Sequence, residues 1–236
     1  MIPLRDANPT HRTPVVTLAI IATCILVFLY QLSLGDAALG RFVTDWGVVP
    51  AELVRSLKAG HVLSMEAATL VTSQFLHGGF LHIGGNMLFL WIFGNNVEDR
   101  FGRLQFLVFY LVGGIIAALA QVAIDPGSTV ATIGASGAIA ATLGAYLILF
   151  PAARVTTAIF LVFFYQLIEV PAVVVLVFWF VIQLFSGFGS LGVGDAASEG
   201  GVAFFAHIGG FIFGAAVALL VRVAGGARRP PGLSVG

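Results

Sequence analysis

The segment GASGAIAATLGAYLILF, residues 134–150, decides how this chain folds. Its pattern predicts one apolar helix, but from Ser136 to Phe150 it has only about 15 residues, roughly 22 Å at about 1.5 Å per residue. The hydrocarbon core of a bilayer is about 30 Å thick, so the preceding connection, GSTVATIGASG (127–137), must enter the membrane to meet this helix. Irregular backbone is tolerated at that depth only inside protein or beside a water-filled cavity. We therefore expect Ser136 at the floor of a wet pocket.

The composition of the whole chain agrees with a membrane setting. Of its 236 residues, 59% are hydrophobic and 9% are charged, whereas soluble domains carry about 25% charged residues. Once the apolar segments are subtracted, too few residues remain for a second domain of about 100 residues. One membrane domain, residues 15–223, is therefore expected between a tail of residues 1–14 and a tail of residues 224–236.

The apolar segments predict an all-α fold, a polytopic membrane protein with six transmembrane helices. A span needs about 20 mostly apolar residues, because only a helix or a closed barrel satisfies its own backbone in lipid. The expected spans are residues 15–34, 69–93, 104–124, 136–150, 171–188 and 204–223.

Two connecting segments need an interpretation of their own. The long first loop, residues 35–68, contains PAELVRSLKAG, in which Pro50 suits a helix start and Gly60 a stop, so short interfacial helices are expected there. The apolar stretch 155–167 is only about 13 residues long and is followed by Glu169. Because a charge at mid-membrane costs about 2.5–3.5 kcal/mol, we expect this stretch to be an interfacial or dipping segment rather than a span.

The distribution of basic residues orients the spans, because cytoplasmic loops are rich in Lys and Arg. Six spans leave basic residues outside only in the first loop, whereas a seventh span at 155–167 would move the arginines of the C-terminal tail outside. We therefore expect six spans with both termini in the cytoplasm. The inside segments then carry Arg5, Arg12, Arg100, Arg103, Arg154, Arg222, Arg228 and Arg229.

Polar side chains gather at one depth in three of these spans. The second, fourth and sixth spans all run from outside to inside, so residues near their starts share the outer leaflet. His77, His82 and Asn86 begin the second, Ser136 begins the fourth and His207 begins the sixth. The serine hydroxyl and the imidazole of His207 could thus come within hydrogen-bond reach, which is how a histidine activates a weak nucleophile.

The neighbouring residues suit this arrangement. Small residues at every fourth position should let the fourth and sixth helices pack closely. No Asp or Glu lies deep in any span, so a Ser-His dyad is expected rather than a triad. His82 and Asn86, four residues apart on one helical face, could donate to an oxyanion beside the Ser136 backbone N–H. The small residues are Ser136, Ala140 and Gly144 on the fourth span and Ala206, Gly210 and Gly214 on the sixth.

Four strings around these residues resemble the motifs of the rhomboid family of intramembrane serine proteases, in its bacterial six-span form. FLHGGFLHIGGN (75–86) resembles the second-span H-x-x-x-x-H-x-x-x-N motif, and GASG (134–137) resembles the nucleophile motif. AHIGGFIFG (206–214) resembles the motif around the base, and VEDRFG (97–102) resembles the E-x-R-x-G segment after the second span. The order, spacing and membrane context of these motifs agree with the family.

The resemblance implies Ser136 as the nucleophile, His207 as general base and then acid, and His82 with Asn86 as oxyanion donors. It implies cleavage of transmembrane segments of other proteins near their outer ends, in a bacterial plasma membrane, without a metal or cofactor. The structural candidates are His77, Gly134, Gly137, Glu98, Arg100, Gly210 and Gly214.

Two positions depart from the family's pattern. Ala68 and Thr69 stand where many relatives carry Trp-Arg, and Ala140 stands where many carry an aromatic ring that supports the imidazole. The orientation of His207 must then come from other packing.

Two further functions remain as alternatives to the protease. A non-catalytic rhomboid-like binder of membrane helices predicts loss of Ser136 or His207, and both are present. A transporter, or a haem or metal protein using the histidines, needs intramembrane charges or more ligands at the same depth, and the sequence offers none. Zero net charge with scattered basic residues argues against nucleic acid as a partner. The expected partners are the lipid bilayer and transmembrane protein substrates.

Overall fold

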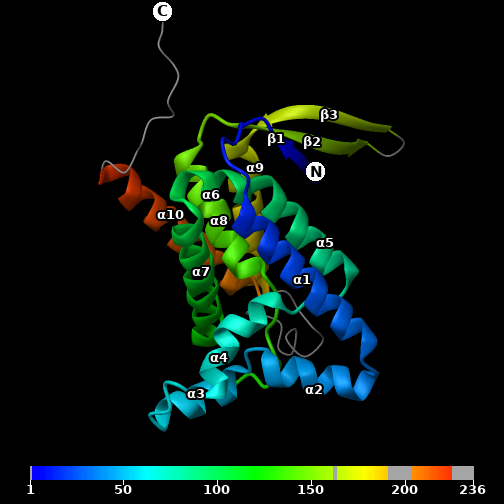
Figure 1. Ribbon diagram of the computed structural model, residues 1–236, viewed down its shortest axis with the longest axis vertical. Helices are drawn as coiled ribbons and strands as arrows, with labels where there is room; N and C mark the ends of the chain where they lie inside the picture. The colour runs from blue at the N-terminus through cyan, green and yellow to red at the C-terminus, as the bar shows by residue number, and fades with distance from the viewer. Residues whose placement is uncertain (1, 162–163, 191–202, 225–236) are drawn as a thin grey trace, which may run out of the picture.

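The computed structural model describes residues 2–161, 164–190 and 203–224, and it consists of a helix bundle with a small antiparallel sheet at one end (Figure 1). Almost all of the predicted C-terminal tail lies outside these residues. In chain order the elements are β1 (Ile2–Asp6), α1 (Val15–Ser33), α2 (Asp36–Trp46), α3 (Pro50–Lys58), α4 (Met65–Thr72), the 3-10 turn η1 (Ser73–Phe75), α5 (Phe80–Phe89), the π-turn η2 (Leu90–Gly94), α6 (Asn95–Phe101), α7 (Arg103–Ile124), α8 (Ser136–Leu149), β2 (Arg154–Leu161), β3 (Phe164–Pro171), α9 (Ala172–Ser190) and α10 (Phe204–Val223).

The long helices confirm a polytopic helical membrane protein. Within the described ranges, four helices are long and apolar enough to cross a bilayer: Val15–Ser33, Arg103–Ile124, Ala172–Gly189 and Phe204–Val223. A bent pair, Met65–Phe75 with Phe80–Phe101, adds one candidate, and α8 is a shorter apolar helix. The count of six spans requires the bent pair and α8 to cross once each, and it stays a prediction.

The second span differs from the continuous helix predicted over residues 69–93. Helical structure stops at Phe75 and restarts at Phe80, with a bend of 80° between the two parts. The break contains the adjacent glycines Gly78 and Gly79, and Gly79 is fully extended with a φ of 163°. Two neighbouring glycines weaken a helix because their backbones lose the most freedom on ordering. After the break, the helix continues through η2 and α6 as far as Phe101.

The long first loop forms short helices, as predicted. Helices α2 and α3 lie there, and α4 begins there and runs into the predicted second span, at the end of the molecule opposite the sheet (Figure 1). Helix α3 begins at Pro50, and the chain turns at Gly60, whose φ of +81° favours glycine. The predicted helix start and stop are therefore confirmed.

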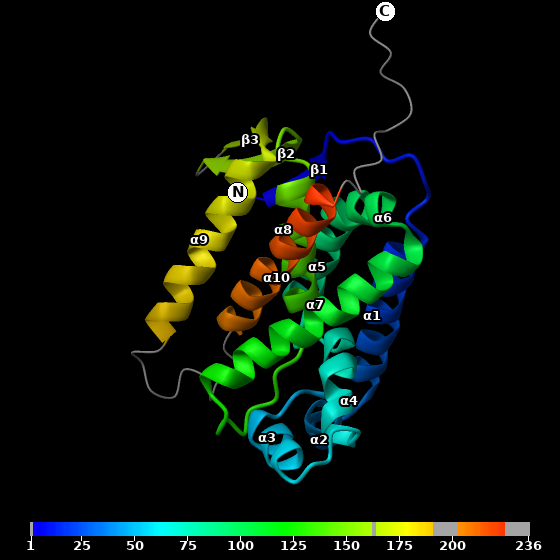
Figure 2. The same cartoon turned by 90° about the vertical axis from the view of Figure 1, so that its left-hand side faces the viewer.

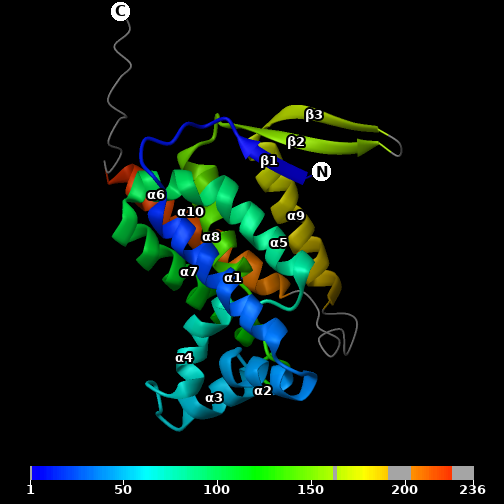
Figure 3. The same ribbon diagram turned by 45° about the vertical axis from the view of Figure 1, so that its right-hand side comes forward.

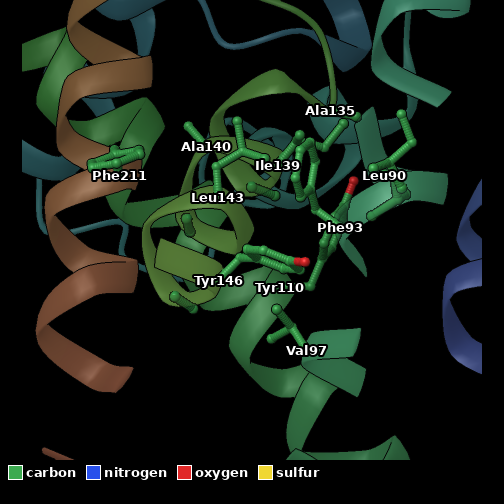
Figure 4. Close-up of a cluster of buried hydrophobic side chains, with 14 of the residues drawn as sticks. Leu90, Phe93, Val97, Tyr110, Ala135, Ile139, Ala140, Leu143, Tyr146 and Phe211 are labelled. Carbon is green, nitrogen blue, oxygen red and sulfur yellow. The ribbon is translucent and has the colours of Figure 1, made fainter. Parts of the chain in front are cut away.

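Helix α8 lies at the centre of the bundle. Every side chain from Gly137 to Tyr146 is buried, and the helix contacts α7, α9, α10 and η2. Figure 4 shows how Leu143 and Tyr146 meet aromatic and aliphatic side chains of the neighbouring helices, including Phe93 and Tyr110. A helix enclosed in this way is surrounded by protein instead of lipid, which explains how a helix this short fits inside the membrane domain.

Helices α8 and α10 touch backbone to backbone. A Cβ at Gly210 would overlap the carbonyl oxygen of Gly137, and one at Gly214 would overlap the carbonyl oxygen of Ala141. A Cβ at Gly144 would meet the carbonyl of Phe211 in the same way. The predicted close packing of these two helices is therefore present, and glycine is required at its contact points.

The stretch predicted as an interfacial or dipping segment is a β-hairpin. Strands β2 and β3 pair antiparallel, and β1, from the predicted N-terminal tail, pairs with β2 to complete the sheet (Figure 3). The sequence RVTTAIFL of β2 is rich in β-branched residues, which favour strands. The stretch does not form a helix, and β3 runs directly into α9.

Two buried carboxylates fasten the N-terminal segment to the bundle. Glu98 of α6 accepts hydrogen bonds from the Val16 N–H at 3.0 Å and from the Thr17 N–H at 2.7 Å, and so caps the start of α1. Asp6 of β1 accepts hydrogen bonds from the Tyr146 hydroxyl at 2.8 Å and the Asn96 amide at 2.6 Å. Burial raises the pKa of the Asp6 carboxyl, and the Tyr146 hydrogen bond opposes that rise.

Gly214→Ala should destabilise the protein by about 1–3 kcal/mol or more, because the added methyl overlaps a backbone carbonyl that cannot move alone. Gly84→Ala on α5 is the matched control, since nothing lies within 4 Å of the methyl it adds. That change should be neutral or stabilising by about 0.5–1 kcal/mol. Unfolding in detergent measures both, and equal losses would contradict the backbone contact.

Glu98→Ala should lower stability by more than about 2 kcal/mol, because it leaves two N–H groups and the Thr17 hydroxyl without their shared acceptor. Asp99→Ala is the control: its neighbouring carboxylate accepts one exposed hydrogen bond, from the His11 N–H at 2.9 Å. Its loss should cost less than about 1 kcal/mol. Thermal unfolding in detergent compares the two variants, and a Glu98→Ala protein as stable as Asp99→Ala would rule out the cap.

Candidate active site

Ser136 and His207 form a direct hydrogen bond in the structure. The Ser136 Oγ and the His207 Nε2 are 2.7 Å apart, although the two residues are 71 positions apart in the chain. Ser136 is the first residue of α8 and is partly exposed, whereas His207 lies in the first turn of α10 and is buried. The close packing of α8 on α10 brings the two helix starts together.

The loop before Ser136 is irregular, and its backbone is satisfied by protein. The Thr132 and Val48 backbones exchange two hydrogen bonds, at 2.8 and 3.0 Å. The Gly134 N–H donates to the Ser73 carbonyl oxygen at 2.9 Å. This is how non-helical chain is tolerated beside a membrane helix. Gly134 itself has a φ of +126°, and a Cβ there would lie 2.7 Å from the His82 Nε2.

His82 lies against the turn that leads into Ser136. Its Nδ1 accepts a hydrogen bond from the Gly78 N–H at 3.2 Å, so the ring proton resides on Nε2. That nitrogen is the one closest to Gly134, two residues before Ser136. His82 therefore turns a hydrogen-bond donor toward the serine turn.

Asn86 lies one helical turn after His82. Its side chain is 8% exposed, and its Nδ2 has no hydrogen-bond partner within the described part of the chain. A buried donor without a partner costs about 1–3 kcal/mol, so its retention needs a reason. The amide therefore holds a donor that no group in the described part of the chain uses.

His77 packs its ring against the ring of His82. It is almost fully buried, with its ring 5.1 Å from the ring of His82 in an edge-to-face arrangement. Its backbone N–H donates to the Gln31 side chain of α1 at 3.0 Å. The ring and the backbone of His77 thus pack against α5 and α1, while neither ring nitrogen has a partner among the residues described.

The other structural candidates take part in helix packing and helix capping. Gly137, Gly210 and Gly214 line the contact between α8 and α10. Glu98 caps α1, and Arg100 lies in the last turn of α6, where a positive charge suits the helix dipole.

Two residues that contact His207 were not identified from the sequence. The His207 Nδ1 is 2.7 Å from the Gln183 Oε1 of α9, and the Trp179 ring lies 5.7 Å from the imidazole ring. Both supply contacts to the imidazole, and Trp179 supplies an aromatic one. Gln183 carried a usable signal, since an amide in the middle of an apolar span is rare and tends to be functional.

The fold and the site together define a class. This is a polytopic helical membrane protein whose bundle encloses a hydrogen-bonded serine and histidine, with further polar groups around them. In the described ranges, no group of three or more His, Cys, Asp or Glu side chains is placed to hold a metal ion.

Comparison with known proteins identifies the family. A family model described as the Rhomboid domain matches residues 64–224, more than half of the chain. Because of this match, the chain belongs to the rhomboid family, which is known for intramembrane proteases.

Individual relatives are similar over shorter segments. The chain is 41% identical over 78 residues to Rhomboid protease GluP of Bacillus subtilis (strain 168), covering 33% of this chain and 15% of the relative. It is 31% identical over 125 residues to Presenilin-associated rhomboid-like protein A, mitochondrial, of Danio rerio, covering 51% and 33%. It is 28% identical over 115 residues to Rhomboid protease GlpG of Klebsiella pneumoniae (strain 342), covering 49% and 37%. The chain thus spans 15% to 37% of the length of these relatives.

Proposed function

We propose that this protein is an intramembrane serine endopeptidase that hydrolyses peptide bonds in or near transmembrane segments of other membrane proteins. The observation that carries the proposal is the 2.7 Å hydrogen bond between the Ser136 Oγ and the His207 Nε2. A serine hydroxyl is a weak nucleophile until an adjacent base takes its proton.

The proposed reaction uses these two side chains in both halves. His207 Nε2 takes the proton of Ser136 as Oγ attacks the scissile carbonyl carbon, and then gives it to the departing amine. The resulting acyl-enzyme is hydrolysed by a water that His207 deprotonates in turn. The dyad needs no metal or cofactor, since the imidazole supplies all proton transfers.

Three donors support stabilisation of the oxyanion. We assign this role to the Ser136 backbone N–H at the start of α8, the His82 Nε2–H and the Asn86 amide. The start of a helix carries unpaired N–H groups and a partial positive charge. The tautomer of His82 and the unpaired amide of Asn86 fit the same role.

The proposed access of water to Ser136 follows from the short length of α8. Ser136 is partly exposed and follows irregular backbone, so a wet pocket can reach it from the membrane surface on that side. We place that surface outside the cell and both termini in the cytoplasm of a bacterium, on the arginine distribution. The relatives named above include a mitochondrial protein, so the type of membrane rests on the bacterial resemblance alone.

Ser136→Ala or His207→Ala should lower cleavage of a model transmembrane substrate in detergent by at least about 10³-fold, because either change removes the nucleophile or its base. A fluorophosphonate probe should label the wild-type protein and leave Ser136→Ala unlabelled. Ser33→Ala, at the exposed end of α1, is the control and should keep full activity. Unchanged cleavage by Ser136→Ala would reject the mechanism.

Asn86→Leu separates an oxyanion donor from a structural amide. Because the Nδ2 makes no hydrogen bond with any residue that the structure describes, the variant should be as stable as the wild type or more so. Its kcat should fall by about 10²–10³-fold with little change in KM, as for loss of one oxyanion donor. Met87→Leu is the neighbouring control. A fully active Asn86→Leu protein would remove this residue from the mechanism.

A further inference from the structure

We infer that Gln183 of α9 is a positioning residue that fixes the ring protons of His207, in the place where a triad would carry a carboxylate. The inference rests on the proposed function, because it concerns the base of the proposed dyad. It begins from the short contact between the Gln183 Oε1 and the His207 Nδ1, at 2.7 Å.

The amide oxygen of Gln183 determines the direction of the two hydrogen bonds that His207 makes. An amide oxygen accepts and does not donate, so the Nδ1 facing it must carry the ring proton. In a neutral imidazole the other nitrogen, Nε2, then has a free lone pair. That lone pair faces the Ser136 Oγ, so the hydroxyl donates to it. Donation runs in one direction, from Ser136 through His207 to Gln183, and His207 is held as a base.

Burial makes this arrangement firm. Gln183 and His207 are each 8% exposed, so water does not compete strongly for the contact. A hydrogen bond in such surroundings is stronger than in water, and an unpaired Nδ1–H there would be costly. The alternative tautomer would bring a bare Nδ1 lone pair against the amide oxygen. The site therefore favours the tautomer that a general base needs.

An amide suits a membrane site better than a carboxylate at this position. A buried charge in the middle of a span costs about 2.5–3.5 kcal/mol on insertion scales, and a neutral amide avoids that cost. Glutamine still directs the negative end of its dipole at Nδ1. It therefore fixes the tautomer in the resting protein and favours the imidazolium when the proton is transferred.

Trp179 completes the environment of the ring. It precedes Gln183 by one helical turn, and its ring lies 5.7 Å from the imidazole and 6.1 Å from the ring of Phe211. Residues 207 and 211 are likewise one turn apart on α10. Two turns of α9 thus face two turns of α10. Figure 2 shows α9 at the outer edge of the bundle beside α10.

Gln183→Met tests the contact, because it keeps the length of the side chain and removes the acceptor oxygen. We expect kcat to fall about 10- to 100-fold, part of what general-base catalysis supplies, with KM unchanged. Gln183→Glu retains an accepting oxygen at the same place and should recover most of kcat. Gln121→Met on α7 is the matched control: its amide oxygen has no partner among the described residues, and the change should alter neither constant.

A spectroscopic measurement tests the tautomer without any substrate. In protein with ¹⁵N-labelled histidine, the ring shifts of His207, assigned by their loss in His207→Ala, should report a proton on Nδ1 and a bare Nε2. Gln183→Met should lose this preference and populate both tautomers, while Gln183→Glu should keep it. A purely structural role would lower stability without moving these shifts.

The two proposals fail in different ways. Cleavage that survives Ser136→Ala would reject the protease mechanism, whatever the tautomer of His207. Loss of cleavage in Ser136→Ala, together with unchanged kcat and unchanged ring shifts in Gln183→Met, would overturn the role of Gln183 alone. A wild-type ring protonated on Nε2 would also overturn it, even if Gln183→Met failed to fold.

Discussion

The structure depends on the direct contact between the backbones of α8 and α10. Lipid gives helices little hydrophobic reason to associate, so van der Waals packing at short range has to hold them together. Gly144, Gly210 and Gly214 permit this approach because a Cβ at any of them would strike a carbonyl group. The approach also fixes the chemistry: Ser136 begins one helix and His207 lies in the first turn of the other, so the interaxial distance sets the length of their hydrogen bond.

Polar groups are divided between the two ends of α8. At its start lies the serine, with His82 against the Gly134 turn, while near its end Tyr146 donates to Asp6 of the sheet. The second set is fully paired, with Asn96 donating to the same carboxylate and Glu98 capping α1 close by. Hydrogen-bond networks in which every group is paired stiffen a structure, whereas a donor without a partner can bind a group of a ligand. The hydrogen bonds near Tyr146 therefore hold α8 in the bundle. The end of α8 that carries Ser136 can then keep its geometry when no substrate is bound.

The sequence predicted the long helices and the meeting of Ser136 with His207 because both follow from span length and chain direction. It did not predict the hairpin, since a short apolar run fits a buried strand as well as a membrane segment. The break at Leu76–Gly79 was missed for a related reason: glycines are common inside membrane helices and seldom end them. An amide at Gln183 in an apolar span was a signal of function, but nothing in a single sequence pairs it with an imidazole 24 residues further along on another helix.

The proposed reaction develops a negative charge on the oxyanion and a positive charge on the imidazole, in a medium that penalises both. The groups assigned to meet them are neutral: the Asn86 amide is proposed for the oxyanion, and the Gln183 amide presents its oxygen to His207. Neutral dipoles cost little when the site is empty, and they need no counter-ion when it is occupied. Because the fold orients these dipoles before the reaction, they can stabilise the charges as soon as these develop. A carboxylate at either position would add a permanent charge to the bundle, and that cost would fall on the folded protein before any substrate arrived.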